Sequence, residues 1–267
     1  MHPTVTIAQR AALNAGKVIL RYWERLDRLT VNVKQRNDFV TEADIQAEQE
    51  IIYVLRKAFP NHSILAEEQG NTQGADDDYQ WLIDPLDGTT NFIHGFPHFA
   101  VSIALRLKGR MEIGVVYDPL RQEMFTAARG NGARLNDRRI RVKTVPNLES
   151  ALLGTGFPLR QPEHIPAYLN MFGSVITRCA ELRRAGSAAL DLSYVAAGRL
   201  DGFWEIGLNA WDIGAGALLV QEAGGLVSDF SGNHHYLQNG NIVAGNSKLF
   251  KALLQTLQPH LTPSLAS

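Results

Sequence analysis

The chain has 267 residues, of which 45% are hydrophobic and 20% charged, with 23 Gly and 11 Pro. This composition excludes disordered, collagen-like and disulfide-scaffold proteins, and the length suits one large domain or two small ones. Twenty-six Lys and Arg against 27 Asp and Glu leave a net charge of -1, so we expect no direct binding to DNA. Any function that depends on charge must therefore be local.

Cysteine usage and the first residues indicate the cytoplasm. Cys179 is the single cysteine and cannot form an intramolecular disulfide. The opening MHPTVTIAQR lacks the basic and apolar segments of a secretory signal. Apolar stretches such as 150–158 and 213–220 are shorter than the ~20 residues that cross a bilayer. We therefore expect a cytoplasmic protein without a membrane segment.

The N-terminal part predicts two amphipathic helices. Apolar residues recur every three or four positions from Ile7 to Leu26, with Pro3 suited to the first turn. A second helix is predicted from Ala43 to Phe59, where Thr41 can cap the start and Asp44 occupies the N3 position. Its apolar face would consist of Ile45, Ile52, Leu55 and Phe59.

The middle of the chain has the composition of strands. Runs at 63–66 and 80–84 predict two of them, and Pro85 should end the second because it lacks the N–H that a ladder needs, leaving 84–90 as a loop. Three further runs separated by short turns predict an antiparallel meander, at 99–107, 111–119 and 122–129.

Beyond Thr144 strands and helices alternate, which is typical of α/β layering. We predict strands at 151–156, 202–206, 226–229 and 241–245, and helices at about 166–180, 188–197, 212–223 and from Lys248 onward. No long linker or internal repeat interrupts the chain. We therefore expect one unit over 1–267, with an α+β half over about 1–145 and an α/β half over 146–267.

Carboxylates gather in one segment. Between Glu67 and Asp87 lie seven of them and no Lys or Arg. Asp76, Asp77 and Asp78 are typical of a solvated polar loop. Glu67 and Asp84 instead follow apolar runs, so their side chains should emerge at strand ends, where function often resides. Carboxylate oxygens of this kind suit Mg²⁺.

The segment DPLDGTTNF (84–92) offers a geometric reason for a cation site. Asp84 and Asp87 are three residues apart and could converge on one centre with the Leu86 carbonyl. Gly88 permits a tight backbone, and Thr89 opens the next segment with a hydroxyl. A simple capped turn is the alternative interpretation.

Two helix starts lie further along the chain. WDIGAG (211–216) places Asp212 at the start of a helix whose small residues allow close approach, and GSAALD (186–191) provides a second start. Either could face an anion through its unpaired N–H groups. An ordinary helix cap is the alternative in both cases.

Three ordered motifs, EE at 67–68, DPLDGTTNF and WDIGAG, together resemble the inositol monophosphatase family. Nearly all of residues 1–258 is similar to its bacterial SuhB-type branch. The resemblance implies an α+β fold, a layered α-β-α-β-α sandwich with mixed and antiparallel sheets. It also implies Mg²⁺-dependent, lithium-sensitive hydrolysis of small phosphorylated polyols such as myo-inositol 1-phosphate, by a homodimer.

The resemblance further implies the site residues. Two or three Mg²⁺ ions would be held by Glu67, Asp84, the Leu86 carbonyl, Asp87 and Asp212. The catalytic residues would be Glu67, Asp44 and Thr89, the last two positioning and deprotonating a water. Substrate would contact Gly88, Thr89, Arg183, Gly186, Ser187, Ala188, Glu205 and Asp212. Lys34 sits near the lysine of the family's mobile loop.

Two alternatives concern function. Related phosphatases that act on fructose 1,6-bisphosphate, NADP or 3′-phosphoadenosine phosphate share the metal motifs. Some SuhB-type members also act with RNA polymerase and Nus factors in ribosomal RNA antitermination. For this second role the notable feature is a basic stretch, defined by Arg134, Arg138, Arg139, Arg141 and Lys143. It could be a charged edge strand or a surface for an acidic partner or RNA.

Overall fold

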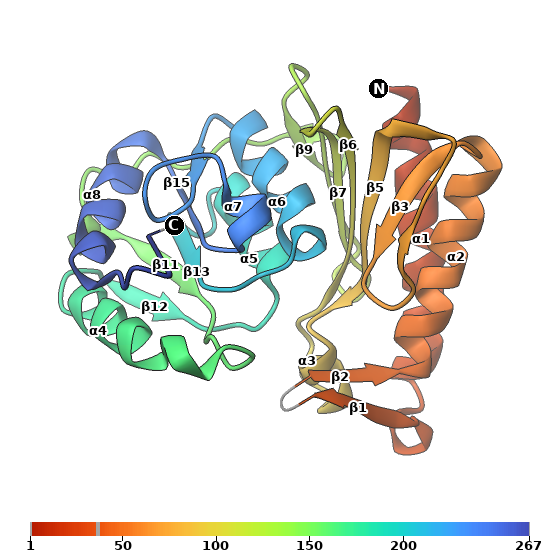
Figure 1. Ribbon diagram of the computed structural model, residues 1–267, viewed down its shortest axis with the longest axis horizontal. Coiled ribbons are helices and arrows are strands. Elements are labelled where there is room, and N and C mark those ends of the chain that lie inside the picture. Colours follow the sequence, from red (N-terminus) through yellow and green to blue (C-terminus); the bar gives the residue numbers. More distant parts are fainter. Residues whose placement is uncertain (1, 36–37, 267) are drawn as a thin grey trace.

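A computed structural model describes residues 2–35 and 38–266. Figure 1 shows five layers, in which two sheets alternate with three pairs of helices. The outer pair on one side is α1 (Pro3–Trp23) and α2 (Glu42–Ala58), the middle pair is α5 (Ala188–Ala196) and α6 (Ala210–Glu222), and the outer pair on the other side is α4 (Ile165–Ile176) and α8 (Ser247–Leu257). This arrangement confirms the predicted α-β-α-β-α sandwich.

The larger sheet has eight strands in the order β10-β9-β8-β7-β6-β5-β3-β4. Their bounds are β3 (His62–Ala66), β4 (Gly70–Thr72), β5 (Asp76–Asp87), β6 (Ala100–Leu107), β7 (Arg110–Asp118), β8 (Glu123–Ala128), β9 (Ala133–Leu135) and β10 (Arg138–Arg139). Strands β5 to β10 pair antiparallel, which confirms the meander, and β3 runs parallel to β5. The basic stretch begins on β9 and continues through β10, an exposed edge strand.

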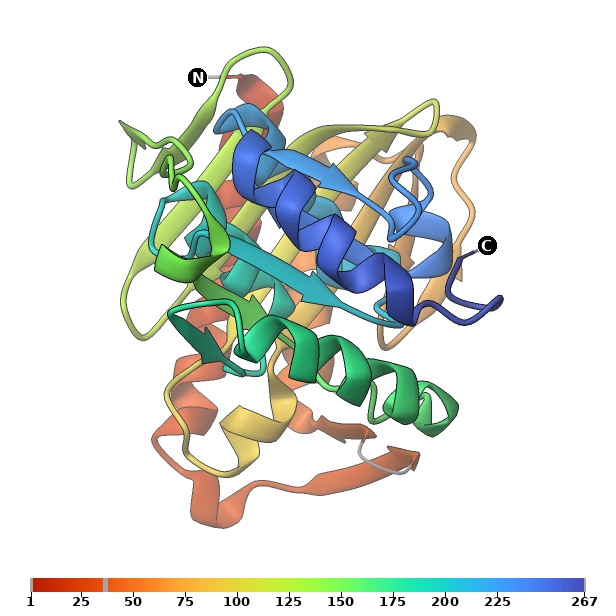
Figure 2. The same cartoon turned by 90° about the vertical axis from the view of Figure 1, so that its left-hand side faces the viewer.

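The smaller sheet has the order β12-β11-β13-β15-β14. Its strands are β11 (Leu152–Thr155), β12 (Glu181–Arg183), β13 (Gly202–Glu205), β14 (Leu226–Ser228) and β15 (Ile242–Gly245). Helices α4 and α8 lie across its outer face (Figure 2). Parallel and antiparallel neighbours both occur, so this sheet is mixed, as expected.

Shorter elements complete the chain. A hairpin of β1 (Val31–Gln35) and β2 (Asp38–Thr41) lies beside the short helix α3 (Thr89–Ile93) (Figure 1). The remaining elements are α7 (Tyr236–Asn239) and 3-10 turns at Leu26–Arg28, Leu148–Ser150, Pro162–His164 and Gln258–His260. Within the described ranges, every helix is too short or too polar to span a membrane.

The predicted loop at 84–90 is wrong. Strand β5 continues through Pro85 to Asp87, and α3 begins at Thr89. The pairing of β5 with β6 shifts register between Asp84 and Asp87, so the missing N–H of Pro85 falls where the regular ladder is already interrupted. The run Asp76–Asp78, expected in a loop, forms the start of the same strand.

The predicted apolar face of α2 is also partly wrong. Ile45 is 38% exposed, whereas Asp44 and Glu48 are both fully buried, one turn apart on the inner face. They continue the stripe of Ile51 and Leu55 along the helix. The helix thus presents apolar side chains to the core and two acids toward one end of the sheet.

Glycines let α6 approach its neighbours closely. A Cβ on Gly114 of β7 would lie 2.8 Å from the carbonyl oxygen of Ala215, and one on Gly216 would lie 2.6 Å from Leu192 of α5. Both distances are too short for a methyl group, so only glycine permits this packing. The close packing of α6 fixes the position of its first turn, which carries Asp212.

Candidate active site

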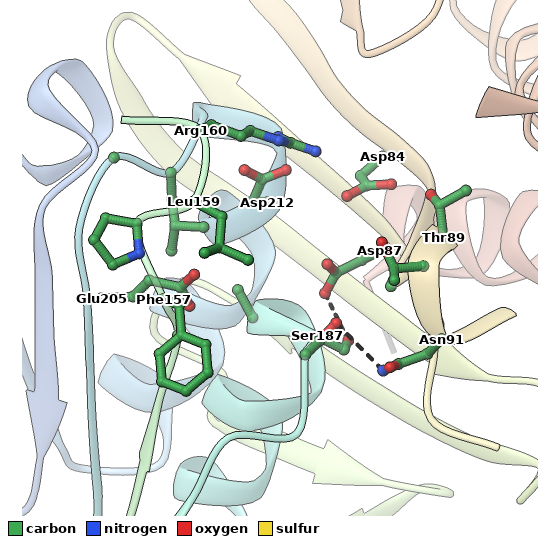
Figure 3. A pocket seen from close by; sticks show the side chains of 18 of the residues that line it. Asp84, Asp87, Thr89, Asn91, Phe157, Leu159, Arg160, Ser187, Glu205 and Asp212 are labelled. Carbon is green, nitrogen blue, oxygen red and sulfur yellow. Dashed lines mark hydrogen bonds between the residues drawn. The ribbon is translucent and has the colours of Figure 1, made fainter. Parts of the chain in front are cut away.

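A pocket lies where β5 and α3 meet the first turns of α5 and α6 (Figure 3). Its volume is about 230 Å³. It is lined by Phe39, Glu67, Asp84, Leu86, Asp87, Gly88, Thr89, Thr90, Asn91, Gly156, Phe157, Pro158, Leu159, Arg160, Gln161, Arg184, Gly186, Ser187, Ala188, Glu205, Ile206, Gly207, Leu208 and Asp212. The two halves of the chain therefore contribute opposite walls.

The turn after β5 is built around Gly88. Its φ of +98° is one that side chains rarely adopt, and a Cβ there would lie 3.0 Å from the His98 carbonyl oxygen. Before it, Asp84 accepts a hydrogen bond from the Leu86 N–H at 3.0 Å. After it, the Thr89 hydroxyl lies 3.0 Å from the Leu86 carbonyl oxygen. This compact turn directs the Asp84, Asp87 and Thr89 side chains into the pocket (Figure 3).

Asp87 joins the two halves of the chain. Its Oδ2 accepts hydrogen bonds from the Ser187 hydroxyl at 2.6 Å and from the Ala189 N–H at 2.7 Å. The carboxylate thus satisfies a backbone donor in the first turn of α5, a favourable place for negative charge. Asn91 adds a second link, since its side chain donates to the Ala185 carbonyl at 2.8 Å.

Asp212 occupies the third position of α6 rather than its cap. Asn209 is the N-cap, and the Asp212 carboxylate accepts a hydrogen bond from its N–H at 2.7 Å. The prediction of a helix start at Asp212 is wrong by two residues, because the helix begins at Ala210. The Ser102 hydroxyl anchors this turn to the large sheet by donating to the Trp211 carbonyl at 3.1 Å.

Asp44 and Thr89 form a hydrogen-bonded pair at the edge of the pocket. The Thr89 hydroxyl donates to Asp44 Oδ1 at 3.0 Å. Thr41 holds the other carboxylate oxygen through its N–H at 2.8 Å and its hydroxyl at 2.5 Å, which confirms the predicted cap of α2. Burial is the main cause that raises the pKa of Asp44 to about 7.

Glu48 positions the segment that carries Glu67. Its two carboxylate oxygens accept the backbone N–H groups of Glu68 at 2.8 Å and Gln69 at 2.9 Å. The Glu67 N–H in turn donates to the Ile83 carbonyl at 3.0 Å. Glu67 is thereby held between β5 and a carboxylate of α2. Burial is the main cause that raises the pKa of Glu48 to about 7.

Negative charge accumulates in the pocket. Burial raises the pKa of Asp84 well above its ordinary value, and the neighbouring charges of Glu67, Asp87 and Asp212 raise it further. Burial, followed by the charges of Glu67 and Asp87, raises the pKa of Asp212 to about 7. For Asp87 burial exceeds the opposing effect of its hydrogen bonds and raises the pKa to about 6. Carboxylates whose ionised forms are disfavoured by burial and by neighbouring negative charge are a set that a cation would stabilise.

The profile of the Inositol monophosphatase family matches residues 1–262. The chain belongs to this family. It is 62% identical over 269 residues to the Nus factor SuhB of Pseudomonas aeruginosa, and the match covers 99% of each chain.

Solved structures of the inositol monophosphatase family have the same fold. The extragenic suppressor protein suhB from Bartonella henselae superimposes with a TM-score of 0.94 at 43% identity, covering 97% of this chain and 99% of that one. An inositol monophosphatase from Anabaena gives 0.85 at 40% identity, covering 96% and 95%.

Inositol monophosphatases use metal ions, and the donor set of this pocket fits one. Glu67, Asp84, Leu86, Asp87 and Asp212 all line it, so carboxylate oxygens and the Leu86 carbonyl are available as donors. These are hard oxygen donors suited to Mg²⁺. Among residues 2–35 and 38–266, no three His, Cys, Asp or Glu side chains form a preassembled metal cluster. The carboxylates therefore surround the pocket without converging on a single point.

One of the predicted substrate-contact residues is wrong. The predicted Gly186, Ser187, Ala188 and Glu205 line the pocket, but Arg183 does not. It ends strand β12 with its side chain outward, 3.5 Å from Glu181. The next residue, Arg184, lines the pocket instead, with its guanidinium 4.9 Å from the centre of the Phe157 ring. The Lys34 side chain lies outside the part that the structure describes.

Three functional positions have no counterpart in the sequence prediction. Arg160 and Arg184 line the pocket. Glu48 is buried and accepts a hydrogen bond from the Glu68 N–H, next to Glu67. Glu48 could have been predicted, because it follows Asp44 by four residues on one helix and therefore lies on the same helix face. Arg160 lies in a segment without periodicity, so no pattern marks it.

Proposed function

We propose that this protein is a Mg²⁺-dependent, lithium-sensitive phosphomonoesterase that hydrolyses myo-inositol 1-phosphate to inositol and phosphate. The observation that carries the proposal is a pocket lined by four carboxylates and by Thr89, whose hydroxyl is hydrogen-bonded to Asp44 behind it. Family membership supports phosphatase chemistry. The carboxylates supply a cation site, and the pair supplies a base.

The physical difficulty of the reaction is charge. A phosphate monoester dianion repels nucleophiles, and its uncatalysed hydrolysis is among the slowest biological reactions. Two or three bound Mg²⁺ ions would offset that charge and make a water easier to deprotonate. The residues that would hold them are Glu67, Asp84, Asp87 and Asp212, together with the Leu86 carbonyl.

The Asp44–Thr89 pair can move a proton. With its own proton directed to Asp44 at 3.0 Å, the Thr89 oxygen can accept a proton from a water in the pocket. Asp44 then receives the threonine proton, and its pKa of about 7 suits a base near neutral pH. The water oxygen attacks phosphorus, the bond to the polyol oxygen breaks, and that oxygen takes a proton from solvent.

The wall opposite the carboxylates suits a polyol. Glu205 lines it, and burial raises its pKa well above the ordinary value, with the charge of Asp191 adding to the shift. A carboxyl group there can accept hydrogen bonds from ring hydroxyls, and when ionised it repels a second phosphate. This arrangement favours inositol phosphates over fructose 1,6-bisphosphate, NADP or 3′-phosphoadenosine phosphate.

The test is phosphate release by the Asp87→Asn variant. We expect it to abolish release from myo-inositol 1-phosphate and to leave the fold intact, because an amide oxygen can still accept from Ser187 and Ala189. Asp78→Asn is the matched control, since Asp78 lies on the same strand outside the pocket. Near-normal turnover by Asp87→Asn would refute the ligand assignment.

Substrate, cation and inhibitor are measured in the same assay. A panel of the four candidate phosphomonoesters, each with Mg²⁺ and graded Li⁺, should show the highest kcat/KM for myo-inositol 1-phosphate and a loss of rate with Li⁺. Failure of every ester would remove the phosphatase proposal. We also propose that the protein acts in the cytoplasm as a homodimer, which light scattering would detect at twice the chain mass.

A second candidate function rests on the name of a relative. The protein from P. aeruginosa that is 62% identical over 99% of both chains is called a Nus factor. We propose that this chain also joins a transcription complex containing RNA polymerase and Nus factors. The wild-type protein and Asp87→Asn should both retain these proteins in a pull-down, and retention by neither would reject the role.

A further inference from the structure

Arg160 brings a positive charge into a pocket dominated by carboxylates. It lies in the loop 156–161, between β11 and the 3-10 turn at Pro162–His164, and lines the pocket. Figure 3 shows its side chain extending past Asp212 on the side that faces Asp84. The guanidinium thus compensates carboxylates that the family motifs assign to metal.

The other arginine of the pocket serves a different wall. The Arg184 guanidinium lies over the Phe157 ring, and its charge lowers the pKa of Asp191 and Glu205. Arg184 therefore balances the acids of the polyol side. Arg160 is the arginine of the cation side, where its side chain lies beside Asp212 (Figure 3).

We propose that Arg160 is a resident counter-cation of the pocket, which a divalent cation must displace when it binds. The inference rests on the proposed metal-dependent function. A guanidinium and a divalent cation both seek the same carboxylate oxygens, and each repels the other. Arg160 therefore stabilises the metal-free pocket and competes with the metal.

Moving the Arg160 guanidinium away from the carboxylates should cost little free energy. Arg160 is exposed, and ion pairs open to solvent contribute only weakly to stability. Backbone bonds in the loop are local, from the Leu159 N–H to the Phe157 carbonyl and from the Gln161 N–H to the Pro158 carbonyl. The ring contact of Phe157 with Tyr168 does not involve Arg160, so it can stay in place when the Arg160 side chain moves.

The test is Mn²⁺ binding to the metal-free protein, followed by electron paramagnetic resonance at constant ionic strength and without substrate. Arg160→Gln should lower the Kd about two- to fivefold, the range expected for the loss of one exposed competing charge. Arg160→Lys should stay near the wild-type value. Arg56→Gln is the matched control, because Arg56 is an exposed arginine near the far end of α2 from Asp44.

A second readout separates competition from a purely structural role. Without metal, Arg160→Gln should melt at a lower temperature than wild type, because the carboxylates lose their counter-charge. Saturating Mn²⁺ should then raise its melting temperature by more than it raises that of wild type. Arg56→Gln should show the wild-type increase.

The outcomes are distinct. Tighter binding by Arg160→Gln with an unchanged Arg56→Gln supports the inference. Wild-type or weaker binding by Arg160→Gln overturns it and leaves the proposed phosphatase standing. If wild type itself binds no Mn²⁺ at millimolar concentration, the metal site fails, and both proposals fall.

Discussion

Glu48 never reaches the pocket surface, yet it should control metal affinity. Both of its oxygens accept backbone N–H groups, from Glu68 at 2.8 Å and Gln69 at 2.9 Å. The variant Glu48→Gln keeps the shape and replaces one oxygen by an NH₂ group, which cannot accept. One of the two backbone donors then faces another donor, and the segment that holds Glu67 must shift.

The magnitude follows from these two bonds. Leaving one buried backbone donor unsatisfied costs about 1–3 kcal/mol. Burial raises the pKa of Glu48 to about 7, so the neutral amide recovers part of the free energy that the buried charge loses. We therefore expect a destabilisation of about 1–2 kcal/mol at pH 8. A shift of Glu67 should also weaken metal binding about 10- to 100-fold, as for other residues that support metal ligands.

Two assays measure these effects. Urea unfolding gives the change in free energy of unfolding, and Mn²⁺ titration gives the change in Kd. Phosphate release at rising Mg²⁺ should show that most of the rate returns at saturation, because Glu48 positions a ligand and does not touch substrate. Glu50→Gln is the matched control, since Glu50 lies on the same helix outside the pocket. A variant Glu48→Gln with wild-type metal affinity would refute the reasoning.

The remaining two predictions concern the turn around Gly88. Burial, with Arg121 nearby, lowers the pKa of His98 to about 4, so the unfolded chain takes up a proton first. The contribution of His98 to stability should therefore fall as pH decreases from 6.5 to 4, by at most about 3 kcal/mol, whereas buried carboxylates with raised pKa values contribute in the opposite direction. Urea unfolding at pH 6.5 and at pH 4 should show that His98→Gln lacks this loss relative to wild type, and an equal change in free energy of unfolding for both proteins would contradict the prediction. Gly88→Ala should cost about 1–3 kcal/mol from its positive φ, plus its contact with the His98 carbonyl. Gly109→Ala, with φ of +81° and nothing within 4 Å of the added carbon, isolates the backbone contribution.

Local patterns predicted the elements and part of the site. Periodicity located the long helices, and the order of Thr41 and Asp44 predicted the cap that the structure confirms. The motif around Gly88 predicted which residues share a turn, because residues three apart in a tight turn cannot be far from one another. The family resemblance then related this turn to Asp212, which spacing alone could not do.

Features that depend on tertiary contacts escaped prediction. Pro85 was expected to end a strand, but a register shift in β5, between Asp84 and Asp87, accommodates it. The choice between Arg183 and Arg184 depends on where β12 ends, and a one-residue change reverses which side chain faces the pocket. Ile45 was placed inside because it is apolar, whereas the site required the acids of α2 to be buried.

The hydrogen bonds from Ser187 and Ala189 to Asp87 have a consequence for synthesis on the ribosome. The serine emerges 100 residues after the aspartate that it contacts, and Asp212 emerges later still. The large sheet can therefore fold while its acidic turn still lacks the opposite wall. A chain interrupted before α6 would contain most of the acidic residues and no complete site, so prematurely terminated products should be inactive even when their first layers are folded.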